Sequence, residues 1–190
     1  ALTSATLPDS VTSIGKGAFS NDTALTSLHL GSGIASIGES AFVGSNNLAS
    51  LTVDPANTVY SVEDGALYSK GNAGRTLVLY LPPKTDTDVT VPEGTTAIAD
   101  AAFASNTSLR RVVLPEGLTT IGYGAFDGDA NLTDLVIPDS VTVARGLVNN
   151  GLDTIELGSK VTELWMTPRE TAAPRHIIVR GGNDGEFYYE

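Results

Sequence analysis

The sequence repeats itself with a fixed period. Phe19 and Phe42 are 23 residues apart, and so are Phe103 and Phe126. The leucines that open the repeated units have the same spacing of 23 residues: Leu2, Leu25 and Leu48, then Leu109 and Leu132. A period of about 20 to 50 residues predicts a stack of like supersecondary units, which is a solenoid.

The unit beginning at Leu109 reads as one coil of such a stack. Residues 112–114 place Val112 and Leu114 on one face of a short strand, because side chains two apart in a strand share a face. Pro-Glu-Gly at 115–117 is turn chemistry. Residues 118–121 form a second extended stretch, and Gly122 allows a sharp bend or a close backbone approach. Ala and Phe at 125–126 then enter the interior.

Leucines at set offsets within this period are typical of a leucine-rich-repeat solenoid. One unit buries too little apolar surface to offset the entropy of ordering its backbone, so only a stack is stable. We therefore predict a β-rich α/β-type leucine-rich-repeat solenoid. Its concave side carries a parallel sheet, and its convex side carries short strands, turns and one-turn helices.

The third copy contains an insertion. Val89 follows Leu51 by 38 residues, which is one period of 23 and 15 extra residues. Residues 66–70 and 76–81 are strand-like and flank Gly-Asn-Ala-Gly at 71–74. Two strand-like runs around such a turn indicate a β-hairpin, here placed at about residues 57–85. Alternation predicts Leu77, Leu79 and Leu81 facing inward, with Val78 and Tyr80 outward.

The repeats unite the chain into one domain. We expect a single solenoid over residues 1–190 with about eight coils, of which the C-terminal ones, 138–190, are degenerate. End coils of a solenoid differ from the consensus because they cap it. Since residues 1–3 already lie inside a repeat, we also expect the chain to be cut from a longer precursor.

Composition excludes several classes of partner. The 22 acidic and 11 basic side chains give a formal net charge of −11. This surface repels phosphate backbones and anionic lipids, so we expect no nucleic-acid partner and no membrane insertion. The chain has no cysteine, which excludes disulfides and thiolate metal sites. No cofactor is expected.

Two rows of side chains lie between the apolar residues of the predicted concave strands and face solvent. One row is Ser4, Ser27, Ser50, Arg111, Asp134 and Thr154, and the other is Thr6, His29, Thr52, Val113, Val136 and Glu156. A concave sheet is where solenoids usually bind partners. The candidate ligand-binding residues are Ser27, His29, Ser50, Thr52, Arg111, Asp134 and Glu156. For any one of them, a merely solvated strand residue is the favoured alternative.

A second candidate surface is the insertion. Tyr60, Tyr68 and Tyr80 cluster around the hairpin and are candidates for a contact patch, because tyrosine is enriched at interfaces. The alternative is that the three rings pack the hairpin itself, and this alternative is favoured.

The sequence motifs give little support for a metal site or a catalytic site. Residues 127–131 have a superficial likeness to a calcium loop but lack its glycine at the sixth place and its closing glutamate, so no metal is expected. His29 and His176 are the only histidines and fall on distant coils. Neither a nucleophile elbow nor a phosphate loop is present. We therefore expect no enzyme and no catalytic residue.

The repeat Leu-x-x-Leu-x-Leu-Pro-x-x-Val-Thr-x-Ile-Gly-x-x-Ala-Phe resembles the BspA-like class of bacterial leucine-rich-repeat surface proteins. The best copies are 2–19, 25–42 and 109–126, and residues 64–70 resemble the Asp-Gly-Val-Leu-Tyr hairpin common in that class. The class often has cysteine three residues after the Phe. This chain has Asp22, Ser45, Asn106 and Asp129 there, whose short polar groups can bond the backbone of the turn.

The resemblance implies secretion, attachment to the cell surface, and adhesion to host or matrix proteins or to other bacteria. We therefore expect a monomeric, non-catalytic protein-binding module, extracellular or on a bacterial cell surface, whose partner is an extracellular protein. One alternative is a structural spacer of a larger surface protein. Another is a targeting domain of a glycan-degrading enzyme, although the two rows lack aromatic side chains for stacking on sugars.

Overall fold

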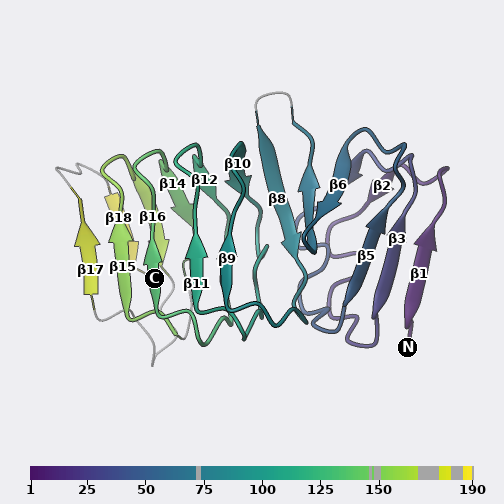
Figure 1. Cartoon of the computed structure of the whole chain (residues 1–190), viewed down its shortest axis with the longest axis horizontal. Helices are drawn as coiled ribbons and strands as arrows, with labels where there is room; N and C mark the ends of the chain where they lie inside the picture. The colour runs from purple at the N-terminus through teal and green to yellow at the C-terminus, as the bar shows by residue number, and fades with distance from the viewer. Residues whose placement is uncertain (72–73, 146, 148–150, 167–175, 181–185, 190) are drawn as a thin grey trace.

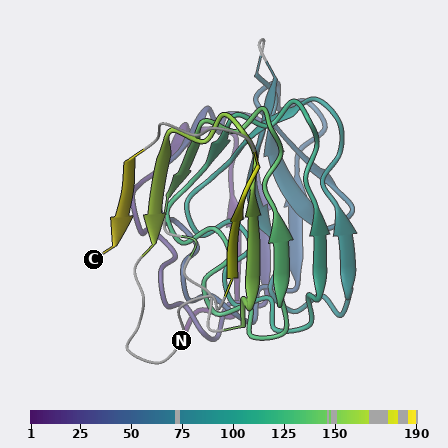
Figure 2. The same ribbon diagram turned by 90° about the vertical axis from the view of Figure 1, so that its left-hand side faces the viewer.

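The computed structural model describes residues 1–71, 74–145, 147, 151–166, 176–180 and 186–189, with residues 165–166 and 186–189 described by their backbone only. Within these residues the chain forms 18 β-strands and no helix. The strands lie side by side along the long axis of the molecule (Figure 1) and form two layers that face each other (Figure 2). This is the predicted leucine-rich-repeat solenoid.

The first layer contains the strands that the sequence predicts for the concave sheet. They are β1 (Ser4–Leu7), β3 (Ser27–Leu30), β5 (Ser50–Val53), β9 (Asp88–Thr90), β11 (Arg111–Val113), β13 (Asp134–Val136), β15 (Thr154–Leu157) and β17 (His176–Val179). Pairing is parallel, and in the N-terminal part each residue lies beside its counterpart one period away, as Ser4, Ser27 and Ser50 do. The degenerate copies stay in register, with Asp134 beside Thr154 and Thr154 beside His176.

The second layer contains the other strands. They are β2 (Ser13–Ile14), β4 (Ser36–Ile37), β6 (Tyr60–Glu63), β7 (Ala66–Ser69), β8 (Arg75–Tyr80), β10 (Thr95–Ile98), β12 (Thr120–Ile121), β14 (Val143–Arg145), β16 (Glu163–Met166) and β18 (Glu186–Tyr189). Eight of these strands form one continuous sheet in the order β6-β7-β8-β10-β12-β14-β16-β18. β2 and β4 pair only with each other among the described strands.

The insertion is larger than one hairpin. β6, β7 and β8 form an antiparallel three-stranded meander, and β8 then pairs in parallel with β10. Asp64 and Gly65 connect β6 to β7 with φ of 48° and 75°. Positive φ at both central residues is the requirement of a tight hairpin turn whose twist matches that of the strands.

The meander separates the interior into two apolar clusters. Leu67 and Leu79 belong to the N-terminal cluster, whereas Tyr68, Leu77 and Tyr80 belong to the C-terminal one. The register shifts between Leu67 and Tyr68, which changes the simple alternation of faces. Both faces of the inserted sheet therefore carry buried side chains.

The prediction that Tyr80 faces outward is consequently wrong. Tyr80 is 4% exposed, and its ring stacks on Phe103 with a centroid distance of 5.2 Å. It lies one period before Phe103, so it takes the place of the repeat phenylalanine in the third coil. The inward prediction for Leu77, Leu79 and Leu81 is confirmed, since each is at most 5% exposed.

The predicted one-turn helices are also wrong. The segment around each repeat phenylalanine consists of successive turns, and it contains a residue with positive φ at the same place in four copies: Gly17, Ser40, Ala101 and Gly124. A residue in this conformation interrupts a right-handed helix. The freed amides pair between coils instead, as Phe19 N does with Ala41 O at 2.8 Å.

Three of the four polar residues three places after the aromatic ring, Ser45, Asn106 and Asp129, bond the turn backbone as expected. Ser45 Oγ donates to Phe19 O, and Asn106 Nδ2 donates to Phe103 O at 2.6 Å. Asp129 Oδ1 accepts from Asn106 N at 2.7 Å. Ser45, Asn106 and Asp129 are all at most 2% exposed, so these bonds satisfy polar groups inside the stack.

Asn57 fastens the insertion to the second coil. Its Nδ2 donates to Gly31 O at 3.1 Å and to Ile34 O at 3.0 Å, and its Oδ1 accepts from Val59 N and Tyr60 N. The side chain is 1% exposed. It therefore satisfies four backbone groups that lie away from water.

We expect Asn57→Ala to lower the free energy of unfolding by about 3 kcal/mol or more, because it leaves several buried backbone groups without partners. Urea unfolding measures the change. Asn46→Ala is the control, since Asn46 is exposed, and it should change the midpoint little. Equal effects of the two substitutions would contradict this role of Asn57.

Candidate functional site

The exposed face of the first layer is built by strict alternation. In β3, Leu28 and Leu30 are fully buried while Ser27 and His29 between them are partly exposed. In β11 and β13, Val112 and Leu135 are buried and their neighbours are exposed. Alternation combined with the period therefore produces the two predicted rows of solvent-facing side chains.

The predicted site residues form two groups. Ser27 lies beside Ser50, and His29 Nδ1 and Thr52 Oγ1 share a hydrogen bond of 2.9 Å. Strand pairing stops after β5 and resumes at β9, because the meander enters between these coils. Arg111, Asp134 and Glu156 consequently belong to the C-terminal part of the face (Figure 1), and the structure does not bring all seven predicted residues together.

A groove of about 420 Å³ lies between β11 and β13 in the C-terminal part. We call it the first-layer groove. It contains two of the three predicted charged residues of this region, Arg111 and Asp134, but not Glu156. It is also lined by Arg110, Val112, Val113, Leu114, Glu116, Val136 and Pro138.

The charges in the first-layer groove are available to a partner. Among the described residues, no carboxylate forms an ion pair with Arg111. Asp134 accepts a hydrogen bond from Thr133 Oγ1 at 2.7 Å. A guanidinium and a carboxylate therefore lie one coil apart without satisfying each other.

Two valines of the solvent-facing rows, Val113 and Val136, are not among the predicted site residues. Val113 is 39% exposed and Val136 is 45% exposed, and both line the first-layer groove. Ile178, in register beside Glu156, is 49% exposed. The sequence does contain a signal for this apolar surface. In the row that begins with the polar residues Thr6 and His29, the later coils have apolar residues instead.

Glu156 has a different environment from the other charged candidates. Arg180 Nε donates to Glu156 Oε1, and this bond lowers the pKa of the Glu156 carboxyl. The two side chains form an exposed ion pair, which contributes little to stability but neutralises Glu156. Arg180 was not predicted as part of this face.

The predicted tyrosine patch is not an exposed surface. Tyr60, Tyr68 and Tyr80 are 7%, 4% and 4% exposed. The Arg75 guanidinium lies 4.5 Å from the centre of the Tyr68 ring, and Tyr80 Oη donates to Asp86 Oδ2 at 2.6 Å. Burial, followed by the bond to Asp86, raises the pKa of the Tyr80 phenol. The favoured alternative, that these rings pack the insertion, is confirmed.

The histidines and the acidic loop singled out from the sequence do not come together in the described residues. In the part of the chain that is described, no three His, Asp or Glu side chains come together as a metal site. Asp129, from the loop with superficial likeness to a calcium site, is fully buried and bonded to Asn106 N. His29 and His176 lie on β3 and β17, at distant places in the stack (Figure 1). The described residues also contain no helix long and apolar enough to cross a membrane.

Comparison with known families agrees with this architecture. A family model described as BspA-type leucine-rich-repeat region matches six copies, over residues 1–75 and 85–164. The chain therefore belongs to the BspA-type leucine-rich-repeat family. Comparison with curated protein sequences gives no match.

Three solved structures have the same fold. A leucine-rich-repeat protein from Eubacterium ventriosum superposes with a TM-score of 0.73 at 22% identity, over 92% of this chain and 54% of that one. A leucine-rich cell surface protein from Faecalibacterium prausnitzii gives 0.66 at 22%, over 95% and 60%. The pneumococcal vaccine antigen PcpA gives 0.64 at 21%, over 94% and 55%. The chain thus spans between about half and three fifths of these relatives.

Proposed function

We propose that this chain is a non-catalytic, monomeric binding module of a secreted or surface-displayed bacterial protein, and that it binds an extracellular protein. The observation that carries the proposal is the first-layer groove, which is lined by two exposed valines and by an arginine and an aspartate that do not pair. Adhesion to host or matrix protein, or to another bacterial surface protein, is the role that we propose for this binding.

The composition of the first-layer groove favours protein over other ligands. Protein interfaces combine an apolar centre with a polar rim and are enriched in arginine. Val113 and Val136 supply apolar surface, and Arg111, Glu116 and Asp134 supply charges around it. The solvent-facing rows contain no aromatic ring on which a sugar could stack. Family membership and a relative described as a cell surface protein support the extracellular location.

A solid-phase screen against extracellular-matrix proteins, host receptor ectodomains and a glycan array tests the proposal. We expect saturable binding to a protein that weakens as salt is added, because charge pairs at an interface rim are screened. A glycan ligand would instead favour the targeting domain of a glycan-degrading enzyme. Lack of binding to every protein and glycan in the screen would favour a structural spacer.

Arg111→Ala combined with Asp134→Ala should weaken that binding at least about tenfold, which corresponds to about 1.4 kcal/mol. The matched control is Arg145→Ala combined with Glu163→Ala. It also removes one arginine and one acid, from an ion pair between β14 and β16 of the second layer with an Nε–Oε1 distance of 2.7 Å. Equal affinities of the two double variants, measured by biolayer interferometry, would contradict a binding role for the groove.

A further inference from the structure

The turn segments that follow β2, β10 and their counterparts are joined by a ladder of backbone hydrogen bonds between coils. In the first coil, the amides of Gly17, Phe19 and Asn21 donate to carbonyls in 39–43 at N···O distances of 2.7 to 3.1 Å. In the fourth coil, the amides at 101, 103 and 105 donate in the same way to carbonyls in 123–127. The repeat thus offers three donors at alternate residues to the next coil.

This ladder is interrupted after the second coil. The amides of Ser40, Phe42 and Gly44 occupy the same three places, and among the described residues none has an acceptor. The chain instead enters the meander, and when it returns, Tyr80 N bonds Ala102 O of the fourth coil at 2.7 Å. Three donors at alternate residues therefore remain unused.

The ladder of aromatic rings is interrupted at the same place. Phe42 stacks on Phe19 with a centroid distance of 5.9 Å, and Tyr80 stacks on Phe103 at 5.2 Å. Among the described rings, none stacks on the other side of Phe42. The column of stacked rings is thus interrupted between Phe42 of the second coil and Tyr80 of the third.

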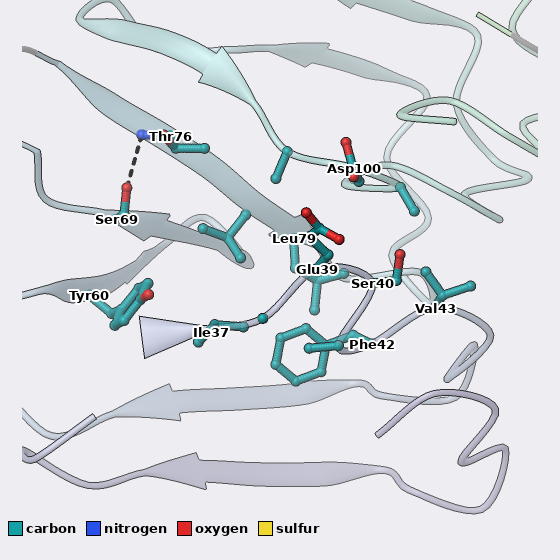
Figure 3. Close-up of a pocket in the computed structure, with 15 residues that line it drawn as sticks. Ile37, Glu39, Ser40, Phe42, Val43, Tyr60, Ser69, Thr76, Leu79 and Asp100 are labelled. Atoms are coloured by element: carbon teal, nitrogen blue, oxygen red, sulfur yellow. Dashed lines mark hydrogen bonds between the residues drawn. The ribbon is translucent and has the colours of Figure 1, made fainter. Parts of the chain in front are cut away.

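A cleft of about 430 Å³ occupies this place. We call it the coil cleft. Ser40, Phe42 and Val43 lie along one wall, while Leu79 of β8 and Asp100 lie on the opposite side (Figure 3). Glu39 and Asp100 line it as well, so two carboxylates belong to a cleft whose remaining walls are mostly apolar or small.

The coil cleft coincides with a departure from the repeat in the sequence, which is alanine at position 99 in place of glycine. The repeat has glycine at this place in the second and fifth coils, where a Cβ on Gly38 would lie 2.5 Å from Lys16 N and one on Gly122 would lie 2.6 Å from Asp100 N. Ala99 carries a Cβ there and lines the coil cleft. Ala99 N still donates to Leu77 O of the preceding coil at 2.9 Å, but its side chain borders the coil cleft and therefore has room.

We propose that the coil cleft binds a short peptide segment of a partner protein, which takes the turn conformation that this segment has in the other coils. Carbonyls at alternate residues of the peptide accept from the amides of Ser40, Phe42 and Gly44, as the next coil does elsewhere in the stack. A bulky apolar side chain of the peptide packs against the open side of Phe42. A basic side chain pairs with Asp100, because the other carboxylate of the cleft, Glu39, already forms an ion pair with Lys16. This is recognition through backbone hydrogen bonds at an open edge, as in strand addition but by a turn segment, at a site separate from the first-layer groove.

A synthetic peptide with the sequence of residues 12–21, Thr-Ser-Ile-Gly-Lys-Gly-Ala-Phe-Ser-Asn, serves as the probe. It is an equivalent turn segment and contains one lysine and one phenylalanine. Fluorescence anisotropy should show saturable binding with a Kd below about 1 mM. Amide hydrogen exchange at Ser40, Phe42 and Gly44 should slow at least about tenfold when the cleft is occupied. The same peptide with alanine in place of phenylalanine should bind at least about tenfold more weakly.

Ala99→Trp should abolish peptide binding, because the indole fills the coil cleft. Gly15→Trp is the matched control, since Gly15 has the same repeat place in the first coil and a Cβ there meets nothing within 4 Å. It should leave affinity unchanged. Thermal unfolding of both variants establishes that they fold, and the alanine peptide on the unmodified chain provides the decisive comparison if either does not.

Several results would overturn the proposal. One is the lack of saturable binding, and another is binding that survives Ala99→Trp in a folded protein. Binding lost only in Gly15→Trp would place the peptide at the end of the first coil. Dimerisation of the chain alone, abolished by Ala99→Trp, would assign the coil cleft to a second copy of this chain.

Discussion

Asp129→Asn is expected to stabilise the fold at neutral and alkaline pH and to flatten its pH dependence. Asp129 is fully buried, and its Oδ1 accepts from Asn106 N at 2.7 Å. Burial raises the pKa of the Asp129 carboxyl to about 9, the Asn106 amide opposes this shift, and the charge of Asp127 adds to it. The carboxyl is therefore neutral in the folded chain at pH 7 and ionised in the unfolded chain.

The sign of the effect follows from proton binding. Between about pH 4 and pH 9 the folded state holds a proton on Asp129 that the unfolded state has lost, so stability falls as pH rises. The slope from this one group reaches about 1.4 kcal/mol per pH unit. Below this window both states are protonated, and above it the loss is complete.

An amide at position 129 removes this dependence, because it is neutral at every pH and can bond the turn as Asn106 does. We expect the free energy of unfolding at pH 8 to rise by about 3 kcal/mol or more. Urea unfolding at pH 5, 7 and 8.5 measures it. Glu93→Gln makes the same change of charge at an exposed residue and should alter stability little. Parallel pH profiles of Asp129→Asn and the unmodified chain would contradict a buried neutral carboxyl.

Gly122→Ala is expected to destabilise the fold by about 2 to 3 kcal/mol. A Cβ at Gly122 would lie 2.5 Å from Asp100 Oδ1, 2.6 Å from Asp100 N and 2.7 Å from Ala99 C. Two of these atoms belong to the backbone of the preceding coil, which cannot move without disturbing the ladder. Relief of the contact therefore requires separation of two stacked coils.

Gly15→Ala is the matched comparison for Gly122→Ala. Both glycines have the same repeat place, but a Cβ at Gly15 meets nothing within 4 Å. We expect a change within about 0.5 kcal/mol, or slight stabilisation, because alanine restricts the unfolded chain. Urea midpoints of the two variants measure the contrast. A similar loss of stability in both variants would show that contact with the preceding coil is not the reason for glycine at this repeat position.

The period in the sequence predicts the parts of the fold that repeat. It places Ser4, Ser27 and Ser50 in register, and it places Arg111 and Asp134 one coil apart on the same face. Both results follow because a stack with a constant period converts spacing in sequence into position in space.

The period fails where the stack is irregular. Alternation predicts Tyr80 outward because it assumes a sheet with one solvent face, whereas the meander has buried side chains on both faces. The pairing of Glu156 with Arg180 joins residues 24 apart across degenerate coils, so no repeat offset indicates it. The coil cleft left a single trace in the sequence, alanine at position 99 in place of the repeat glycine.

Cysteine footprinting tests binding at the first-layer groove most directly, because the chain has no cysteine of its own. Val136→Cys places one thiol in the groove, and Ser13→Cys places one on β2 of the second layer as a control. With saturating protein partner from the screen, alkylation at position 136 should slow at least about tenfold while that at position 13 stays unchanged. Protection at position 13 alone, or at neither position, would contradict recognition through this face.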